Sequence, residues 1–415
     1  GLENLIFGAD TIKNTDLIRR KWLNNNFSGL VFSLKQKLNN IDLNIGGSLN
    51  RYIGDHYGNI IWMKQASNAN YNHQYYFNDA EKSNRNFYVK ADYRINESTN
   101  LMLDIQNKRI LYSFDGFNDN GESARQDVAL DFTNPKAGIF HKLNNNQSIY
   151  ASYSIGNKEP NRNDYVESSP NSRPQHETLH DIELGYKLVK YNTILSVNLY
   201  NMMYDNQLVL TGQINDVGAY TRTNVDNSFR RGIEIEGKQK LFNKLQIQAN
   251  LTLSQNIINE YVEYVDNWDT WGQEQIVHKN TDLAFSPNVI WATQFNYKLS
   301  ENLSLDINSK YVGEQYIDNT SSLDRKLDDY LTHNLQLQYN LNSKLFKTSK
   351  IYFRVNNVLD SEYVSNAWVY RFISNGYDPR ADDHYVTKNN DGGYNMAGYF
   401  PEATRNYMLM LVLGF

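Results

Sequence analysis

The chain has 415 residues, a net charge of −5 at pH 7 and no cysteine, so it offers neither a disulfide framework nor a cysteine-ligated metal site. Its slightly acidic balance is not that of a nucleic-acid-binding protein, and no run approaches the roughly 18 apolar residues of a transmembrane helix. The 31 tyrosines, against only 7 prolines, favour many strands joined by polar turns.

Strict alternation of apolar and polar residues recurs from one end of the chain to the other. Such a period of two residues predicts strands that carry one apolar and one polar face. The segments, in chain order, are LVFSLKQKL from Leu30, LMLDIQ from Leu101, TILSVNLYN from Thr193, LQIQANLTL from Leu245, LSLDINSKY from Leu303, NLQLQYNL from Asn334, KIYFRVN from Lys350 and NYMLMLVLGF from Asn406.

The connections between these segments alternate between short and long. Bacterial outer-membrane barrels have short turns on one side of the membrane and long loops on the other, whereas a soluble sandwich has no reason to keep this rhythm. We therefore predict a transmembrane antiparallel β-barrel. The short connections are expected near 38–41, 95–99, 143–147, 189–193, 242–245, 299–303 and 341–350, and the long ones near 52–85, 112–125, 156–179, 205–230, 256–287, 313–329 and 357–405.

Seven short turns join fourteen strands, and the strand that ends at Phe415 makes fifteen. The first of them is expected at Phe27–Leu38. Because a complete single-chain bacterial barrel has an even number of strands, we expect at least one further strand upstream of this chain.

The last ten residues form an alternating apolar strand with a terminal aromatic. This pattern resembles the signal that the barrel-assembly machinery reads on outer-membrane proteins. The residues that would carry the signal are Tyr407, Leu409, Leu411, Leu413 and Phe415.

Several segments resemble the TonB-dependent outer-membrane receptors, and they occur in the order found in that family. The resemblance implies a 22-stranded barrel closed by an N-terminal plug, of which this chain would be the C-terminal part. The segments are SIGNKEPNRNDYVE (154–167), HETLHDIELGYKL (176–188), FRRGIEIEGKQKL (229–241), YVGEQYIDNTSSLDRKLDDY (311–330), RVNNVLDSEYVSNAW (354–368) and GYFPEATRNYMLMLVLGF (398–415).

The resemblance also implies location in the bacterial outer membrane and energised uptake of a scarce nutrient. An iron chelate, haem or cobalamin is the first expectation for the ligand, and an oligosaccharide is the next. The implied partners are membrane lipid, the missing N-terminal part of the barrel, the TonB complex acting through the plug, and a surface lipoprotein as a cap.

No motif of a hydrolase, metalloprotease, phosphate-binding loop or calcium loop is present, so we expect neither an enzyme nor a cofactor. Two other functions fit the alternation. One is a passive porin of 14 to 16 strands, and the other is a secreted β-sandwich that binds a ligand.

Two long connections combine aromatic and charged residues and are the predicted ligand-binding loops. Rigid aromatics provide contact area at a low entropy cost, while polar neighbours orient a ligand. The alternative is an aromatic girdle at the membrane interface. If the ligand were haem, His278 or His384 would be the axial candidates. The predicted ligand contacts are Tyr261, Tyr264, Trp268, Trp271, Tyr377, Arg380, His384 and Tyr385.

Overall fold

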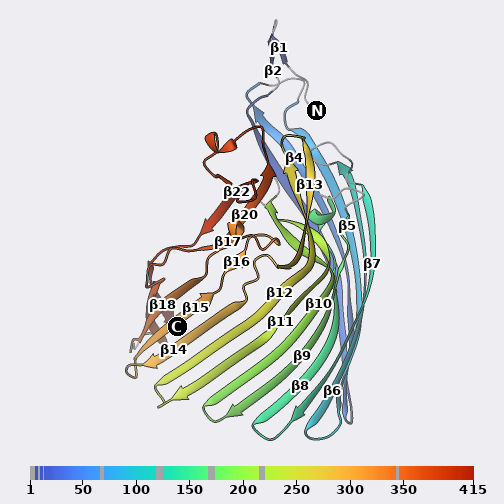
Figure 1. The fold of residues 1–415 in the computed structure, drawn as a ribbon. Coiled ribbons are helices and arrows are strands. Elements are labelled where there is room, and N and C mark those ends of the chain that lie inside the picture. The colour runs from blue at the N-terminus through green and yellow to red at the C-terminus, as the bar shows by residue number, and fades with distance from the viewer. Residues whose placement is uncertain are drawn as a thin grey trace. The chain divides into compact units, whose positions relative to one another are not determined.

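The computed structural model describes residues 5–7, 10–12, 14–65, 70–117, 123, 125–166, 173–214, 220–342 and 345–415. Its regular structure is almost entirely antiparallel β-strand (Figure 1). The chain divides into two compact units. Unit 1 comprises Gly1–Arg94, Leu101–Ala137 and Asn161–Arg173, and unit 2 comprises Ile95–Asn100, Gly138–Pro160 and Pro174–Phe415.

Unit 1 is built from long strands that pair in chain order. In the first hairpin Leu38 pairs with Ile41 and Phe27 with Tyr52. Asn39 occupies the turn with a φ of 48°, a conformation that asparagine tolerates better than most residues. The strands are β3 (Leu17–Leu38), β4 (Ile41–Met63), β5 (His73–Arg94), β6 (Thr99–Phe117) and β7 (Gln126–Lys142), with a small ribbon of β1 (Leu5–Phe7) and β2 (Asp10–Ile12) and the helix α1 (Arg162–Val166).

Unit 2 contains one antiparallel sheet and several extra strands. The sheet runs in the order β8, β9, β10, β11, β12, β14, β15, β18, β19, β23. Its strands are β8 (Gln147–Lys158), β9 (Glu177–Lys190), β10 (Thr193–Ile214), β11 (Tyr220–Leu241), β12 (Leu245–Asn267), β14 (Val289–Lys298), β15 (Leu303–Val312), β18 (Tyr330–Asn340), β19 (Thr348–Asn356) and β23 (Asn406–Gly414).

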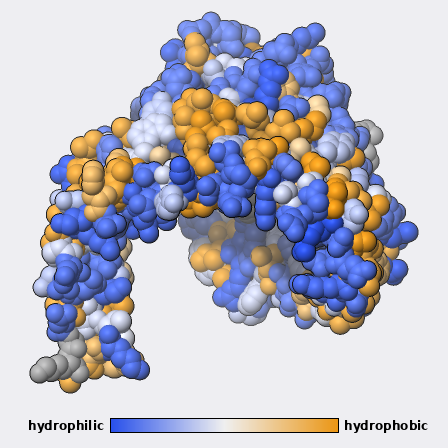
Figure 2. All heavy atoms as spheres, turned by 90° about the horizontal axis from the view of Figure 1, so that it is seen from below, coloured by the Kyte–Doolittle hydropathy of each residue, from blue (hydrophilic) through white to orange (hydrophobic). Residues whose placement is uncertain are grey.

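The register of unit 2 aligns the apolar residues of neighbouring strands in continuous rows. Leu305 pairs with Leu337, Leu337 with Phe353, and Phe353 with Leu409. Leu409 is 74% exposed. No second sheet covers this face in the described part of unit 2, so the β-sandwich alternative is wrong. Exposed hydrophobic residues form contiguous patches on the surface (Figure 2), as expected of a face that meets lipid.

Six of the seven predicted short turns are confirmed, and the seventh, 341–350, joins the paired strands β18 and β19 but includes residues 343 and 344, which lie outside the described residues. Fifteen strands of the described chain correspond to the predicted ones. The first strand begins at Leu17 rather than at the predicted Phe27. Its polar residues remain in the ladder because they have partners on β4: Tyr52 donates to Asn25 Oδ1 at 2.6 Å, and Asn24 donates to Asp55 Oδ2 at 3.3 Å.

Strands extend into several of the predicted long connections, which are therefore shorter than expected. Parts of the connections 52–85, 112–125, 156–179 and 205–230 lie outside the described residues. Strand β12 continues to Asn267, inside the predicted connection 256–287, because Ile258, Tyr261 and Val265 continue the β-forming pattern and are buried. The other long connections in unit 2 also contain regular structure. The additional elements are β13 (Gly272–Asp282), β16 (Gln315–Tyr316), η1 (Leu323–Arg325), β17 (Lys326–Leu327), β20 (Val364–Ile373), η2 (Pro379–Ala381), β21 (Val386–Lys388) and β22 (Tyr394–Pro401).

Candidate ligand-binding loops and polar wall

The long connections of unit 2 pack together into one structure, which we call the loop assembly. It consists of β13 with the part of β12 that pairs with it (257–267), the segment 315–327, and the strands β20 to β22. Strand β12 pairs in parallel with β20 at Asp266–Phe372 and Asn267–Ile373. Asp269, at the tip of the β12–β13 hairpin, accepts hydrogen bonds from the amides of Asn375 and Gly376 at 2.7 and 2.8 Å.

A buried ionic cluster joins the three parts of the loop assembly. Arg325 on η1 donates to Glu263 on β12 at 2.6 Å and to Asp318 at 2.5 Å. Arg371 on β20 donates to the other oxygen of Glu263 at 2.8 Å and also to Asp391. The side chains of Arg325, Glu263 and Arg371 are 4%, 8% and 8% exposed. Glu263 therefore bridges two arginines that come from different connections.

The ionic cluster changes the protonation behaviour of its acids in opposite directions. Burial alone would raise the pKa of Glu263, but Arg325 and Arg371 lower it below its usual value. Burial raises the pKa of Asp318 despite its contact with Arg325, because only one cation compensates this fully enclosed carboxyl. The two arginines thus favour the ionised form of Glu263, whereas burial opposes ionisation of Asp318.

Two predicted ligand-binding residues belong to the interior of the loop assembly. Tyr261 is 5% exposed and lies in an apolar cluster with Ile258 and Leu283. Burial raises the pKa of its phenol. Trp268 stacks on Phe372 with ring centroids 4.0 Å apart, and its indole donates to Tyr370 Oη at 3.3 Å. Both side chains contribute packing in this structure.

Of the two histidines considered for haem, His278 is engaged within the ionic cluster. Its Nε2 lies 2.8 Å from Glu263 Oε2, and its ring stacks on Tyr261. His384 is exposed. In the described residues no group of three or more histidine, aspartate or glutamate side chains is arranged to hold a metal ion.

The remaining candidates lie at the surface. Tyr264 and Tyr377 are each 50% exposed, Tyr385 is 77% exposed and Trp271 is 90% exposed. Arg380 is exposed and donates to Asp378 at 2.6 Å, and this contact lowers the pKa of Asp378 to about 2. These residues are available to a ligand that approaches the loops.

The sequence reasoning missed the ionic cluster. Glu263 and Arg371, for example, are separated by 108 positions in the chain. A signal was present: Glu263 occupies an alternating strand position next to Tyr261 and Val265, both of which are buried. A carboxylate on such a face requires a cation, but the sequence does not show which arginine provides it.

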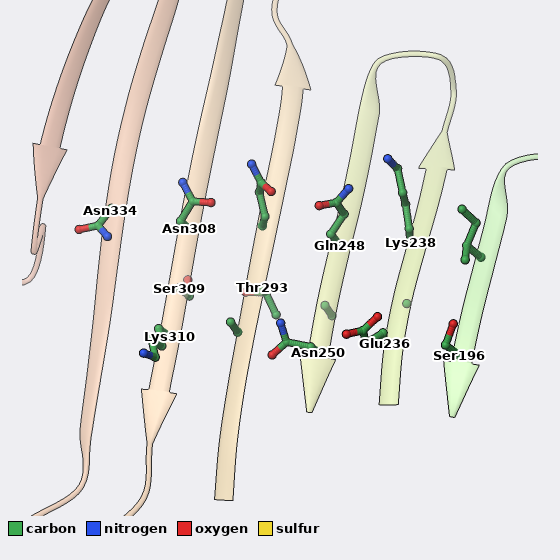
Figure 3. A pocket seen from close by; sticks show the side chains of 15 residues that line it. Ser196, Glu236, Lys238, Gln248, Asn250, Thr293, Asn308, Ser309, Lys310 and Asn334 are labelled. Carbon is green, nitrogen blue, oxygen red and sulfur yellow. The ribbon is translucent and has the colours of Figure 1, made fainter. Parts of the chain in front are cut away.

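The polar face of the unit 2 sheet carries amide and charged residues around a hollow of about 550 Å³ (Figure 3). We call it the polar wall. The register places Lys238 beside Gln248, and Asn308 beside Asn334. The labelled residues lie on the neighbouring strands β10, β11, β12, β14, β15 and β18. On the polar face these are Ser196, Glu236, Lys238, Gln248, Asn250, Asn308, Lys310 and Asn334, whereas Thr293 and Ser309, which pair with each other, stand on the other face of the sheet.

Four residues of the predicted assembly signal lie on β23 and Phe415 directly follows it, and all five are exposed. Tyr407 is 64% exposed and stacks against Phe353. The ring of Phe415, which is 85% exposed, lies edge-on to Phe346 with centroids 5.1 Å apart. In the described chain no helix is of the length and hydrophobicity needed to cross a membrane.

The comparisons with known proteins agree with this architecture. A family model described as the TonB-dependent receptor-like β-barrel matches residues 3–358. No curated protein matches the sequence.

Solved structures of outer-membrane receptors have a similar fold. The ferric-catecholate import receptor Fiu of E. coli K12, in its closed form, has a TM-score of 0.61 at 14% identity, with 95% of this chain and 54% of Fiu covered. The siderophore receptor PiuA of Acinetobacter baumannii has a TM-score of 0.65 at 14% identity, covering 95% and 56%. The copper transporter OprC has a TM-score of 0.70 at 12% identity, covering 96% and 57%. The chain thus spans little more than half the length of each.

Proposed function

Since the chain belongs to the TonB-dependent receptor-like β-barrel family, whose members lie in the bacterial outer membrane, we propose that it is the barrel part of a receptor that imports a scarce nutrient. The ligand class we propose is an iron chelate, haem or cobalamin. Similar structures include receptors whose names specify ferric catecholate and siderophore, which supports the iron chelate first.

The observation that supports this function best is the loop assembly. Arg325 and Arg371 fasten three connections to one carboxylate, Glu263, and Asp269 fastens the hairpin tip. A passive pore gains nothing from such a fixed structure, whereas a receptor needs a pre-organised surface that loses little entropy when its ligand binds. This favours selective binding over the porin alternative.

We infer that the exposed aromatics of the loop assembly contact the ligand. Tyr264, Trp271, Tyr377 and Tyr385 present rings to solvent, and rings of this kind suit a flat or aromatic ligand surface. Arg380, on the same connection as Tyr377 and Tyr385, adds an exposed guanidinium that is paired with Asp378. Tyr261 and Trp268 act through packing, so their removal would disturb the loops rather than a direct contact.

Uptake in cells that express the full-length protein tests the function. The probes are radiolabelled iron as a tris-catecholate or as citrate, haemin, and labelled cyanocobalamin. We expect uptake of one probe that saturates with concentration and stops when TonB is deleted. Uptake that rises linearly with concentration and continues without TonB would identify a porin instead.

Two variants separate ligand contact from loop structure. Trp271→Ala should weaken binding of the transported probe about tenfold, which corresponds to the loss of one good aromatic contact. Lys326→Met, which removes only the ion pair with the exposed Glu314 in the same assembly, should leave binding unchanged. Equal binding by Trp271→Ala and the unmodified receptor would remove Trp271 from the proposed site.

A further inference from the structure

A groove of about 420 Å³ lies on the apolar face of unit 2, between the end of β7 and the strands β8 to β10. Ile139, Ile149, Leu184 and Leu199 form its sides, and Ala151 lies among them. His141 is at the end nearest the short turn at 143–147. The polar wall is a separate place, because its side chains occupy the opposite face of the sheet.

The groove exists because a small residue stands in a row of large ones. The register places Ala151 beside Leu184, and Leu184 beside Leu199. The next row, toward the turn, contains Ile149, Tyr186 and Val197. Alanine ends at Cβ, whereas its neighbours extend several ångströms further from the sheet, so a hollow is left above it.

The depth and lining of the groove determine what can fill it. Ala151, Leu184 and Leu199 all lie within about ten residues of a short turn, which is the length of a strand that spans the hydrocarbon layer. A water molecule would need polar partners, which the sides do not offer. An empty hollow would forfeit the contacts of its lining atoms. The remaining occupant at this depth is an acyl chain.

The end of the groove near the turn favours a lipid with a phosphate. Thr99 Oγ1 lies 2.9 Å from Nδ1 of His141, and among the described residues the Nε2 atom has no hydrogen-bond partner. Lys190 is exposed at the end of β9 and lies on the same strand face as Tyr186. Lys190 does not line the groove but lies four residues beyond Tyr186, at the turn end of β9, so its long side chain can extend toward a phosphate placed between it and His141.

We propose that this groove is a binding site for one phospholipid of the periplasmic leaflet. One acyl chain lies over Ala151 between Ile149 and Leu184, and the phosphate is held by His141 and Lys190. Such a chain gains little from the hydrophobic effect, because the bilayer is equally apolar. Selectivity therefore comes from the fit over Ala151 and from the phosphate contacts.

Native mass spectrometry of the full-length protein, purified in mild detergent and titrated with dipalmitoyl phosphatidylglycerol, tests the proposal. We expect one lipid to be retained more strongly than any other. Ala151→Phe, which fills the groove, should weaken this retention about tenfold. Ala249→Phe is the matched control. Ala249 is on β12, faces the same side of the sheet as Ala151, is exposed, and does not line the groove. Ala151→Leu repeats the test if the larger ring impairs assembly.

Two further comparisons test the phosphate contact. His141→Ala and dipalmitoyl glycerol, which lacks the phosphate, should each reduce retention about tenfold relative to the unmodified protein with phosphatidylglycerol. Unchanged retention by Ala151→Phe and Ala151→Leu, or an equal loss in Ala249→Phe, would overturn the site. Equal retention of dipalmitoyl glycerol would overturn the role of His141 and Lys190.

Discussion

Glu263 shows how a single residue can organise several connections. Its two oxygens contact Arg325 at 2.6 Å and Arg371 at 2.8 Å, and His278 lies beside the second oxygen. Removing three charged groups from water costs several kcal/mol per ion, so the cluster adds little net stability by itself. What it provides is a specific arrangement, because an incomplete cluster would leave a buried charge without a partner.

Arg325→Met should open the loop assembly locally. The substitution leaves Glu263 and Asp318 buried without Arg325, at a cost of about 3–5 kcal/mol. Hydrogen exchange of residues 315–327 and 366–373 should become much faster. Lys326→Met removes the neighbouring ion pair with Glu314, whose carboxylate is 56% exposed, and should cost only about 0.2–1 kcal/mol. If the two variants exchange alike, the cluster does not hold the connections together.

His56 in unit 1 makes part of the structure sensitive to pH. Burial, and then the nearby Arg162, lower its pKa from 6.5 to about 4. Arg162 on α1 is itself fixed by donating to the carbonyls of Gly54 and Asn78, each at 3.0 Å. Protonation of His56 would place a second cation near this anchored guanidinium.

We therefore expect the docking of α1 to weaken in acid. Because the folded pKa of His56 lies below the unfolded value, its contribution to stability is complete above pH 6.5 and is lost as the pH falls toward 4. Solvent screening at this half-buried site limits the loss to on the order of 1–2 kcal/mol. Hydrogen exchange at 162–166, corrected for intrinsic rates, should rise over this range. In His56→Gln the rise should be absent, and its persistence would refute the assignment.

At the scale of elements, the β12–β13 hairpin presents Trp271 in an unusual way. Its φ is 58°, a conformation that costs a bulky residue roughly 1–2 kcal/mol, yet the side chain is 90% exposed and packs against little. Strain without a packing benefit is often found at functional positions. It agrees with the proposed role of Trp271 in ligand contact.

Trp271→Gly should separate folding from binding. Glycine adopts this φ without strain, so the hairpin should be as stable as before or more stable by up to about 1 kcal/mol. Hydrogen exchange of β12 and β13 should be unchanged or slower, while binding of the transported probe should fall. As a control, Thr270→Gly at the neighbouring position should bind the transported probe as strongly as the unmodified receptor. Faster exchange in Trp271→Gly would show that the ring supports the hairpin after all.

The elements also show what the sequence could predict. Alternation and turn spacing located the six short turns that the structure describes in full, because a period of two residues and polar turn residues are local properties. The length of β12 and the presence of β20 and β22 are not predicted, because these strands pair within single long connections, β12 with β13 and β20 with β22, and only two residue pairs join β12 to β20 across the chain. Trp271 could be named from its residue type alone, and its role in ligand contact stays a prediction, whereas the Glu263 cluster depends on arginines 62 and 108 positions away.

At the scale of the whole molecule, the last strand β23 and the terminal Phe415 carry the predicted signal for barrel assembly. Phe415 is 85% exposed and contacts Phe346, so its ring contributes little to the stability of the folded barrel. We expect Phe415→Ala to reduce the amount of heat-modifiable protein in the outer membrane severalfold, at equal synthesis. Tyr191→Ala, which removes a 97% exposed aromatic at another short turn, should have no effect. An equal loss in both variants would indicate general destabilisation.

The intact receptor and a porin differ in how they conduct ions. The polar wall carries Lys238, Lys310 and five carboxamides around its hollow, and an open barrel with such a lining would fill with water. In a receptor of the proposed kind, a plug covers this wall and ions pass slowly.

We therefore expect the full-length protein, reconstituted into a planar bilayer, to show little steady current. If such a plug closes the barrel, urea at a concentration that leaves the barrel folded should open it reversibly. Large, steady channels before urea is added would contradict this, and the porin alternative would then account better for the polar wall.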